Sequence, residues 1–164
     1  MFQGCNNLKM NPSIMGALAT VVALSIDQIT KSVVVANQAA LASGIPIFPG
    51  FNLVMYRNDG VVFGLLGGAP RWVLIALSLA ICLWLAFMLV RSHCSIETLA
   101  FGAIIGGALG NITDRLRLHA VTDFLDFYIG SAHWPAFNMA DVFVMGGAGL
   151  LLMAPWLASR RSSA

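Results

Sequence analysis

Apolar residues form four long windows that contain no charged side chain, at residues 10–26, 72–90, 98–113 and 142–159. Each window holds roughly 16–19 residues, close to the ~20 that an α-helix needs to cross a hydrocarbon core of about 30 Å, and polar flanks can complete the shorter ones. The pattern therefore predicts four transmembrane helices, at about residues 10–30, 71–91, 97–115 and 141–159.

The composition agrees with a membrane protein that is mainly α-helical. The chain is 59% hydrophobic and 10% charged, whereas ordinary soluble domains are about 25% charged. Its net charge of +2 is scattered, which argues against a nucleic-acid surface. A cleaved signal peptide is the alternative for the first window, because Lys9 precedes it. Three further windows, and Asp27 and Lys31 one helical turn apart, favour a retained helix.

The two longer connections lie on one side of the membrane if all four helices cross it. Four Lys and Arg residues fall on the side of the termini and five on the other, so the positive-inside rule does not decide the orientation. The Arg160-Arg161 pair directly after the last window favours cytoplasmic termini. We expect residues 1–164 to form a single integral-membrane domain.

The first long connection, at about residues 32–70, has the composition of a small extracytoplasmic β-rich element. Residues 51–56 are rich in β-formers, and Asn58-Asp59-Gly60 is a turn signal that precedes residues 61–63. We predict a hairpin or curved sheet that lies against the bilayer surface. Its amphipathic segment at about residues 45–66, which includes Phe51 and Phe63, is suited to clamp a bound molecule there. The second connection, at about residues 116–140, is predicted to be a polar loop.

Polar residues suited to chemistry gather at the ends of the last two helices. Helical spacing places Asn111, Asp114 and Arg115 on one face, where they either support a site or hold a neighbouring helix. Asp123 and Asp126 are both flanked by apolar residues, and the pattern does not choose between them.

The start of the last helix combines a cap with an acid. Asn138 can cap this helix, and Asp141 then lies in its first turn, where the helix dipole favours the anion. A carboxylate at a membrane costs roughly 2.5–3.5 kcal/mol on insertion scales, which suggests that such acids have a function.

Two other classes of protein compete with an enzyme. In a small transporter or channel component, Asp27, Asp114 and Asp141 would be proton or ion relays, although the chain has no inverted repeat. In an assembly factor, the polar faces would only dock partners. The histidines and cysteines show no metal-ligand spacing, so we expect neither a metal nor a cofactor.

Five segments, in this order, resemble the bacterial lipoprotein signal peptidase family, also called signal peptidase II. They are residues 27–31, 58–64, 106–115, 121–124 and 137–141. The resemblance implies an inner-membrane aspartic endopeptidase with its active site near the periplasmic face. It would remove the signal peptide of diacylglyceryl-modified prolipoproteins by cutting before the lipidated cysteine. We expect a monomer whose partners are this substrate and membrane lipids.

The resemblance also implies roles for individual residues. It assigns catalysis to Asp123 and Asp141, substrate binding to Asn58, Asn111, Asp114, Arg115 and Asn138, and a structural or supportive role to Asp27 and Lys31. The chain departs from the family at Asp59 and Val61-Val62, where smaller residues are usual. Two carboxylates within hydrogen-bond range tend to share one proton, so one can act as base and the other as acid.

Overall fold

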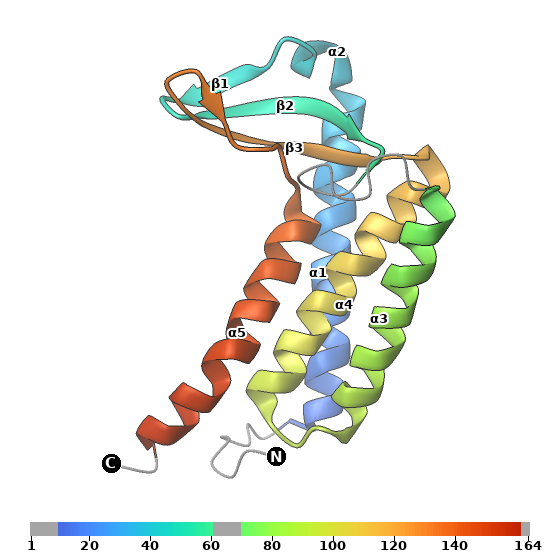
Figure 1. Ribbon diagram of the computed structural model, residues 1–164, viewed down its shortest axis with the longest axis vertical. Coiled ribbons are helices and arrows are strands. Elements are labelled where there is room, and N and C mark those ends of the chain that lie inside the picture. The colour runs from blue at the N-terminus through green and yellow to red at the C-terminus, as the bar shows by residue number, and fades with distance from the viewer. Residues whose placement is uncertain (1–9, 61–69, 162–164) are drawn as a thin grey trace.

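The structure is a computed structural model that describes residues 10–60 and 70–161. Four long helices stand side by side, with a small sheet across one end (Figure 1). They are α1 (Pro12–Ala36), α3 (Arg71–Arg91), α4 (Ser95–Leu118) and α5 (Met139–Arg161). Helix α4 is the centre of the bundle, because α1, α3 and α5 all pack against it.

Three of these helices, α1, α3 and α4, are long and apolar enough to cross a membrane. The described apolar part of α5, Met139–Ala154, is shorter. The large apolar side chains that face away from the bundle support burial in lipid; Leu83 and Leu152, for example, are 73% and 83% exposed. The model thus confirms a mainly helical chain with several apolar helices, and the fourth crossing stays a prediction.

Helix α1 starts and ends for identifiable reasons. The Asn11 side chain accepts a hydrogen bond from the N–H of Ser13 (2.9 Å), and Pro12 occupies the first turn. The helix continues past its predicted end at residue 30, because Val34 is buried against Leu41 and Phe124. The segment predicted to be β-rich from residue 32 therefore begins as helix, followed by the short helix α2 (Gln38–Leu41).

Glycines set the distance between α1 and α4. Gly102, Gly106 and Gly110 recur every fourth residue on the face of α4 that meets α1. A Cβ added at Gly102 would lie 2.2 Å from the carbonyl oxygen of Gly16, so only glycine permits this approach. Close backbone contact of this kind stabilises helix pairs in membranes, where apolar burial alone cannot drive association.

The sheet is antiparallel with the strand order β1-β2-β3-β4. Its strands are β1 (Ile45–Phe48), β2 (Phe51–Asn58), β3 (Val121–Ile129) and β4 (Ala132–His133). The predicted β-rich element is present as β1 and β2, joined through Pro49 and Gly50. The second connection was predicted to be a loop, and this is wrong: its residues 121–129 form β3, which pairs with β2.

The structure describes one of the two aromatic residues named for the predicted clamp. Phe51 packs between Phe48 and Phe127 in tilted ring contacts, with ring centroids 5.1 and 4.7 Å away. Phe63, Val61 and Val62 lie outside the described residues.

We predict that Gly102→Ala destabilises the protein, whereas Gly149→Ala does not. Both changes gain the same intrinsic helix propensity, about 1 kcal/mol. Only the Cβ at position 102 meets backbone, since a Cβ at position 149 has no neighbour within 4 Å. Overpacking of this kind costs about 1–3 kcal/mol. Thermal unfolding in detergent measures the difference, and equal melting temperatures would contradict tight packing of α1 on α4.

Candidate active site

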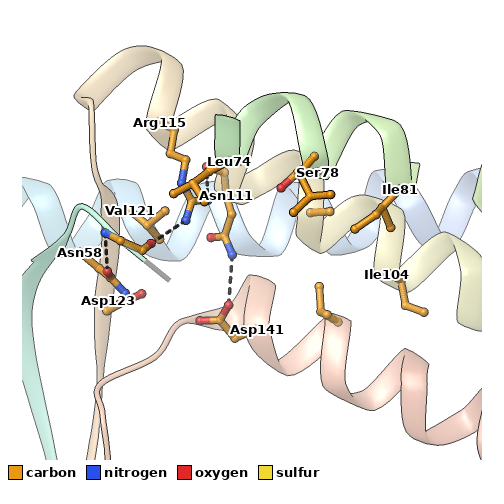
Figure 2. Close-up of a pocket in the computed structure, with 14 residues that line it drawn as sticks. Asn58, Leu74, Ser78, Ile81, Ile104, Asn111, Arg115, Val121, Asp123 and Asp141 are labelled. Carbon is orange, nitrogen blue, oxygen red and sulfur yellow. Dashed lines mark hydrogen bonds between the residues drawn. The ribbon is translucent and has the colours of Figure 1, made fainter. Parts of the chain in front are cut away.

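A cavity of about 310 Å³ opens between α3, α4 and α5 at the end of the bundle that carries the sheet. One part of its wall is polar and the other is apolar (Figure 2). The polar part includes Asn58, Asn111, Arg115, Asp123 and Asp141, and the apolar part includes Leu74, Leu77, Ile81, Ile104 and Val144. Two carboxylates from separate elements, β3 and α5, therefore share one cavity.

Asn138 and Asp141 cap α5 reciprocally. The Asn138 Oδ1 accepts the backbone N–H of Asp141 (3.2 Å), and the Asp141 Oδ2 accepts the backbone N–H of Asn138 (3.1 Å). This arrangement has the form of a capping box. The predicted cap is thus confirmed, and it fixes the Asp141 carboxylate at a helix N-terminus.

Asn138 also joins the two carboxylates. Its Nδ2 donates to Oδ1 of Asp123 (2.6 Å), while the Asn58 Nδ2 donates to Oδ2 of Asp123 (2.9 Å). Asn138 is fully buried and Asp123 is 1% exposed. One asparagine side chain therefore contacts Asp123 and, through its cap, holds Asp141.

Burial raises the pKa of Asp123 to about 6, from an ordinary value of 3.8. The hydrogen bonds from Asn58 and Asn138 oppose this shift, the negative charge of Asp141 adds to it, and the charge of Lys31 opposes it. A carboxyl group with a raised pKa takes up a proton more readily than an ordinary one, which is a property that acid–base catalysis uses.

Asn111 and Arg115 complete the polar wall from α4. The Asn111 Nδ2 donates to Oδ1 of Asp141 (3.1 Å). The guanidinium of Arg115 donates to the carbonyl oxygens of Gly60 (3.0 Å) and Asn111 (3.4 Å). Its Nε has no hydrogen-bond partner among the described residues. The guanidinium of Arg115 interacts electrostatically with both Asp123 and Asp141.

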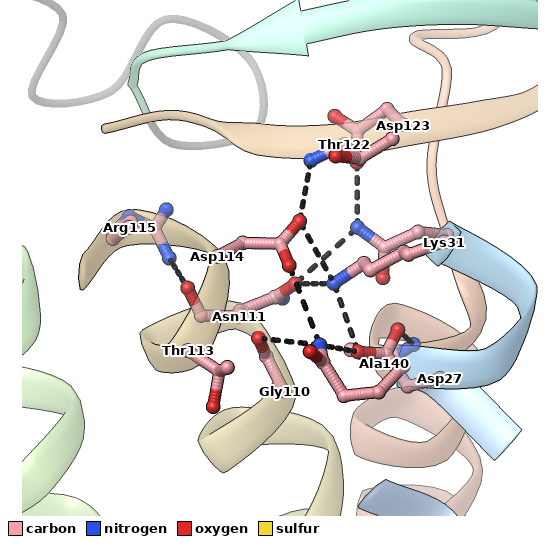
Figure 3. Close-up of polar contacts among 12 residues, drawn as sticks. Asp27, Lys31, Gly110, Asn111, Thr113, Asp114, Arg115, Thr122, Asp123 and Ala140 are labelled. Carbon is pink, nitrogen blue, oxygen red and sulfur yellow. Dashed lines mark hydrogen bonds and ion pairs between the residues drawn. The ribbon is translucent and has the colours of Figure 1, made fainter. Parts of the chain in front are cut away.

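A buried ion cluster lies directly behind this wall (Figure 3). The Lys31 Nζ lies 3.0 Å from Oδ2 of Asp27 and 3.7 Å from Oδ2 of Asp114. The predicted pairing of Asp27 with Lys31 is confirmed. These three side chains do not line the cavity. Asp114, for which substrate binding was predicted, faces the cluster and accepts the backbone N–H of Thr122 (2.9 Å).

The structure distinguishes between Asp123 and Asp126 as candidates for the site, which the sequence pattern could not do. Asp126 contacts the His133 Nδ1 (2.8 Å) and accepts a hydrogen bond from Asn52 (2.9 Å), and it does not line the cavity. Burial pushes the pKa of Asp126 upward, but the hydrogen bonds from His133 and Asn52 outweigh it, so the pKa lies below its usual value. Asp126 is therefore suited to pairing with His133 and not to carrying a proton.

Two features of the site were not identified from the sequence. The Gln28 Nε2 lies 3.1 Å from Asp27 and 3.3 Å from Asp114 and bridges them. A polar residue beside Asp27 in an apolar helix was the available signal. The apolar wall gave no signal, because its residues look like any lipid-facing residues. Among the described residues, no group of three or more His, Cys, Asp or Glu side chains is arranged to hold a metal ion.

Comparisons with known proteins agree with this site. Residues 19–157 match the family described as signal peptidase (SPase) II, Peptidase_A8. A lipoprotein signal peptidase of Aeromonas hydrophila subsp. hydrophila is 44% identical over 140 residues, which cover 81% of this chain and 83% of that protein. One from Serratia proteamaculans is 39% identical over 149 residues, with 88% of each chain covered.

A solved bacterial membrane enzyme shares the fold, with a TM-score of 0.75 and 26% identity over 94% of this chain and 91% of that one. The family match covers most of the described residues, including both carboxylates of the cavity. The chain belongs to the signal peptidase II family.

Proposed function

We propose that Asp123 and Asp141 are the catalytic residues of a membrane-embedded aspartic endopeptidase. Members of this family remove signal peptides from prolipoproteins, and this chain does the same. The observation that carries the residue assignment is the junction at Asn138. It contacts the buried Asp123, whose pKa is raised, on one side and caps a helix with Asp141 on the other.

The two environments define complementary roles. Asp141, held at a helix N-terminus, is the base that takes a proton from water as the water oxygen attacks the scissile carbonyl carbon. Asp123 holds the other proton, polarises the carbonyl oxygen and then protonates the departing nitrogen as the C–N bond breaks. A bound substrate excludes water, which further favours the neutral form of Asp123. The products are a signal peptide carboxylate and a free amine.

The cavity suits a substrate that is apolar on one side of the scissile bond. Its apolar wall descends along α3, α4 and α5, so an apolar signal helix can lie there while the peptide bond reaches the carboxylates. Asn58, Asn111 and Arg115 lie at the polar end, where they can bind the peptide backbone. We propose that the lipid chains of a diacylglyceryl-modified cysteine stay in the bilayer, and that the enzyme cuts before this cysteine.

The topology extends this proposal. We propose that α5 also crosses the membrane, that the termini are cytoplasmic and that the cavity is near the periplasmic face of the inner membrane. Figure 1 supports this arrangement, because α1 begins and α5 ends at the end of the bundle opposite the sheet. Residues of β2 and β3 line the cavity, so the cavity lies on the side of the sheet and not on the side of the termini.

We predict that Asp123→Asn and Asp141→Asn each abolish cleavage, with losses of roughly 10²–10⁴-fold or more. Each change removes either the acid or the base. The test is a gel-shift assay with purified protein and a lipidated prolipoprotein. Asp126→Asn is the matched control, because this buried carboxylate belongs to the same strand as Asp123 but faces His133. Cleavage by either of the first two variants at the rate of the control would refute the assignment.

We predict that the buried carboxylate of Asp123 costs stability at neutral pH. Its folded pKa of about 6 lies above the ordinary 3.8, so the folded state binds more protons between these values. The contribution of Asp123 to the free energy of unfolding is therefore greatest below about pH 4. It is lost as the pH rises through 6, by about 3 kcal/mol at most. Asp123→Asn removes this dependence. The test measures the melting temperatures of the wild type and Asp123→Asn from pH 4 to 8. As the pH rises, the melting temperature of the variant should increase relative to that of the wild type, and a constant difference would contradict a raised pKa.

Asn138→Asp is predicted to keep the helix cap and lose cleavage. Aspartate can still accept the N–H of Asp141, but it has no donor for Asp123 and adds a negative charge beside it. Asn11→Asp is the control, because Asn11 caps α1 through the same kind of side-chain acceptor, far from the cavity. We expect the stability change of Asn11→Asp to stay within the range of a cap change, about 0.5–2 kcal/mol. Asn138→Asp should lower stability further, because it buries a second carboxylate beside Asp123. Activity should fall only in the Asn138 variant; equal activities would show that its donor is dispensable.

A further inference from the structure

The strongest feature outside the cavity is the set of contacts around Lys31. The Lys31 side chain is buried, with 3% of its surface exposed. Two acids, Asp27 and Asp114, already more than compensate its charge. Its shortest contact is nevertheless with a neutral group, the Oδ1 of Asn111 at 2.8 Å. Charge balance alone does not explain this contact.

The two acids beside Lys31 each hold the residue that precedes one of the catalytic aspartates. Asp27 accepts the backbone N–H of Ala140, immediately before Asp141 (2.9 Å). Asp114 accepts the backbone N–H of Thr122, immediately before Asp123 (2.9 Å). Figure 3 shows both anchors converging on the Lys31 ammonium.

The third partner of Lys31 contacts the site directly. Lysine has three N–H donors and no acceptor, so the group of Asn111 that faces it must be the carbonyl oxygen. The amide of Asn111 is then oriented with its Nδ2 toward Oδ1 of Asp141. The same oxygen also accepts from the Asn138 Nδ2 at a longer 3.3 Å, so Lys31 is the nearer of two donors that hold the amide in this orientation. Loss of the lysine would weaken the hold on the amide that contacts the carboxylate.

We infer that Lys31 is a positioning residue for the aspartate pair, and that it acts through Asp27, Asp114 and Asn111 to fix both carboxylates relative to one another. This inference rests on the proposed catalytic role of the pair. It gives Lys31 a function beyond the stability of α1, because the two aspartates belong to different elements, β3 and α5, and α1 links them. Lys31 itself does not line the cavity.

The test replaces Lys31 in an Asp27→Asn background, so that each double variant keeps the net charge of −1 that one cation and two acids give the wild-type cluster. Each double variant is compared with the wild type, which matches its charge, as well as with Asp27→Asn. Asp27→Asn is the reference, because asparagine can still accept the N–H of Ala140. In this background, Lys31→Met removes every donor, and Lys31→Gln keeps an N–H on a side chain one atom shorter. Melting temperature, kcat and KM are measured for all three proteins with a lipidated prolipoprotein.

We expect the three proteins to share the same KM within about twofold and to differ in kcat. Misplacement of a catalytic group by about 1 Å can cost 10²-fold, so the Met variant should lose roughly 10–100-fold relative to the reference and the Gln variant less. A purely structural lysine predicts equal kcat in every variant that folds, and that result overturns the inference. If the Met variant does not fold, the Gln variant decides in the same way against the reference.

Wild type and Asp141→Asn are run in the same assay. An uncleaved substrate with the wild type, or cleavage by Asp141→Asn, would refute the proposed function. Normal cleavage by the wild type, an inactive Asp141→Asn and equal kcat for the reference and Lys31 variants would refute only the role of Lys31.

Discussion

Ionised groups among apolar helices must find their partners inside the protein, because neither lipid nor the bundle interior can solvate them. In this chain, the interaction between Lys31, Asp27 and Asp114 meets that requirement with one cation and two anions from α1 and α4. The carboxylates also accept backbone N–H groups from α5 and β3. The ion pairs that make the burial of these charges tolerable thus also fix where the elements that carry Asp123 and Asp141 begin.

The packing of the helices makes this cluster possible. A Cβ added at Gly110 would lie 2.2 Å from Oδ2 of Asp27, so the carboxylate occupies the space that a larger residue would fill. Gly102 and Gly106 bring α1 equally close at the turns further from the sheet. Helix packing and the geometry of the site therefore depend on one glycine-lined contact, and a change that separates α1 from α4 would disturb both.

The features that local physics determines were predictable from the sequence. Uncharged windows predicted the helices, and the spacing of Asn138 and Asp141 predicted a cap that the structure contains. The sheet was only half predicted, because β2 pairs with β3 across more than 60 residues, as in the contact of Tyr56 with Asp123. No local pattern specifies such a pairing. The anchoring of Ala140 by Asp27 was unpredictable for the same reason.

The two acids of β3 show why the site could not be read from the strand alone. Asp123 and Asp126 have similar local settings, since each is followed by a phenylalanine, but side chains alternate across a strand, so residues three apart face opposite sides. Asp123 faces the cavity, where burial outweighs two amide donors and its pKa rises. Asp126 faces His133 and Asn52, which lower its pKa despite burial. The pKa of Asp123 rises and that of Asp126 falls because the fold brings different groups to each of them, from β2, β4 and the start of α5.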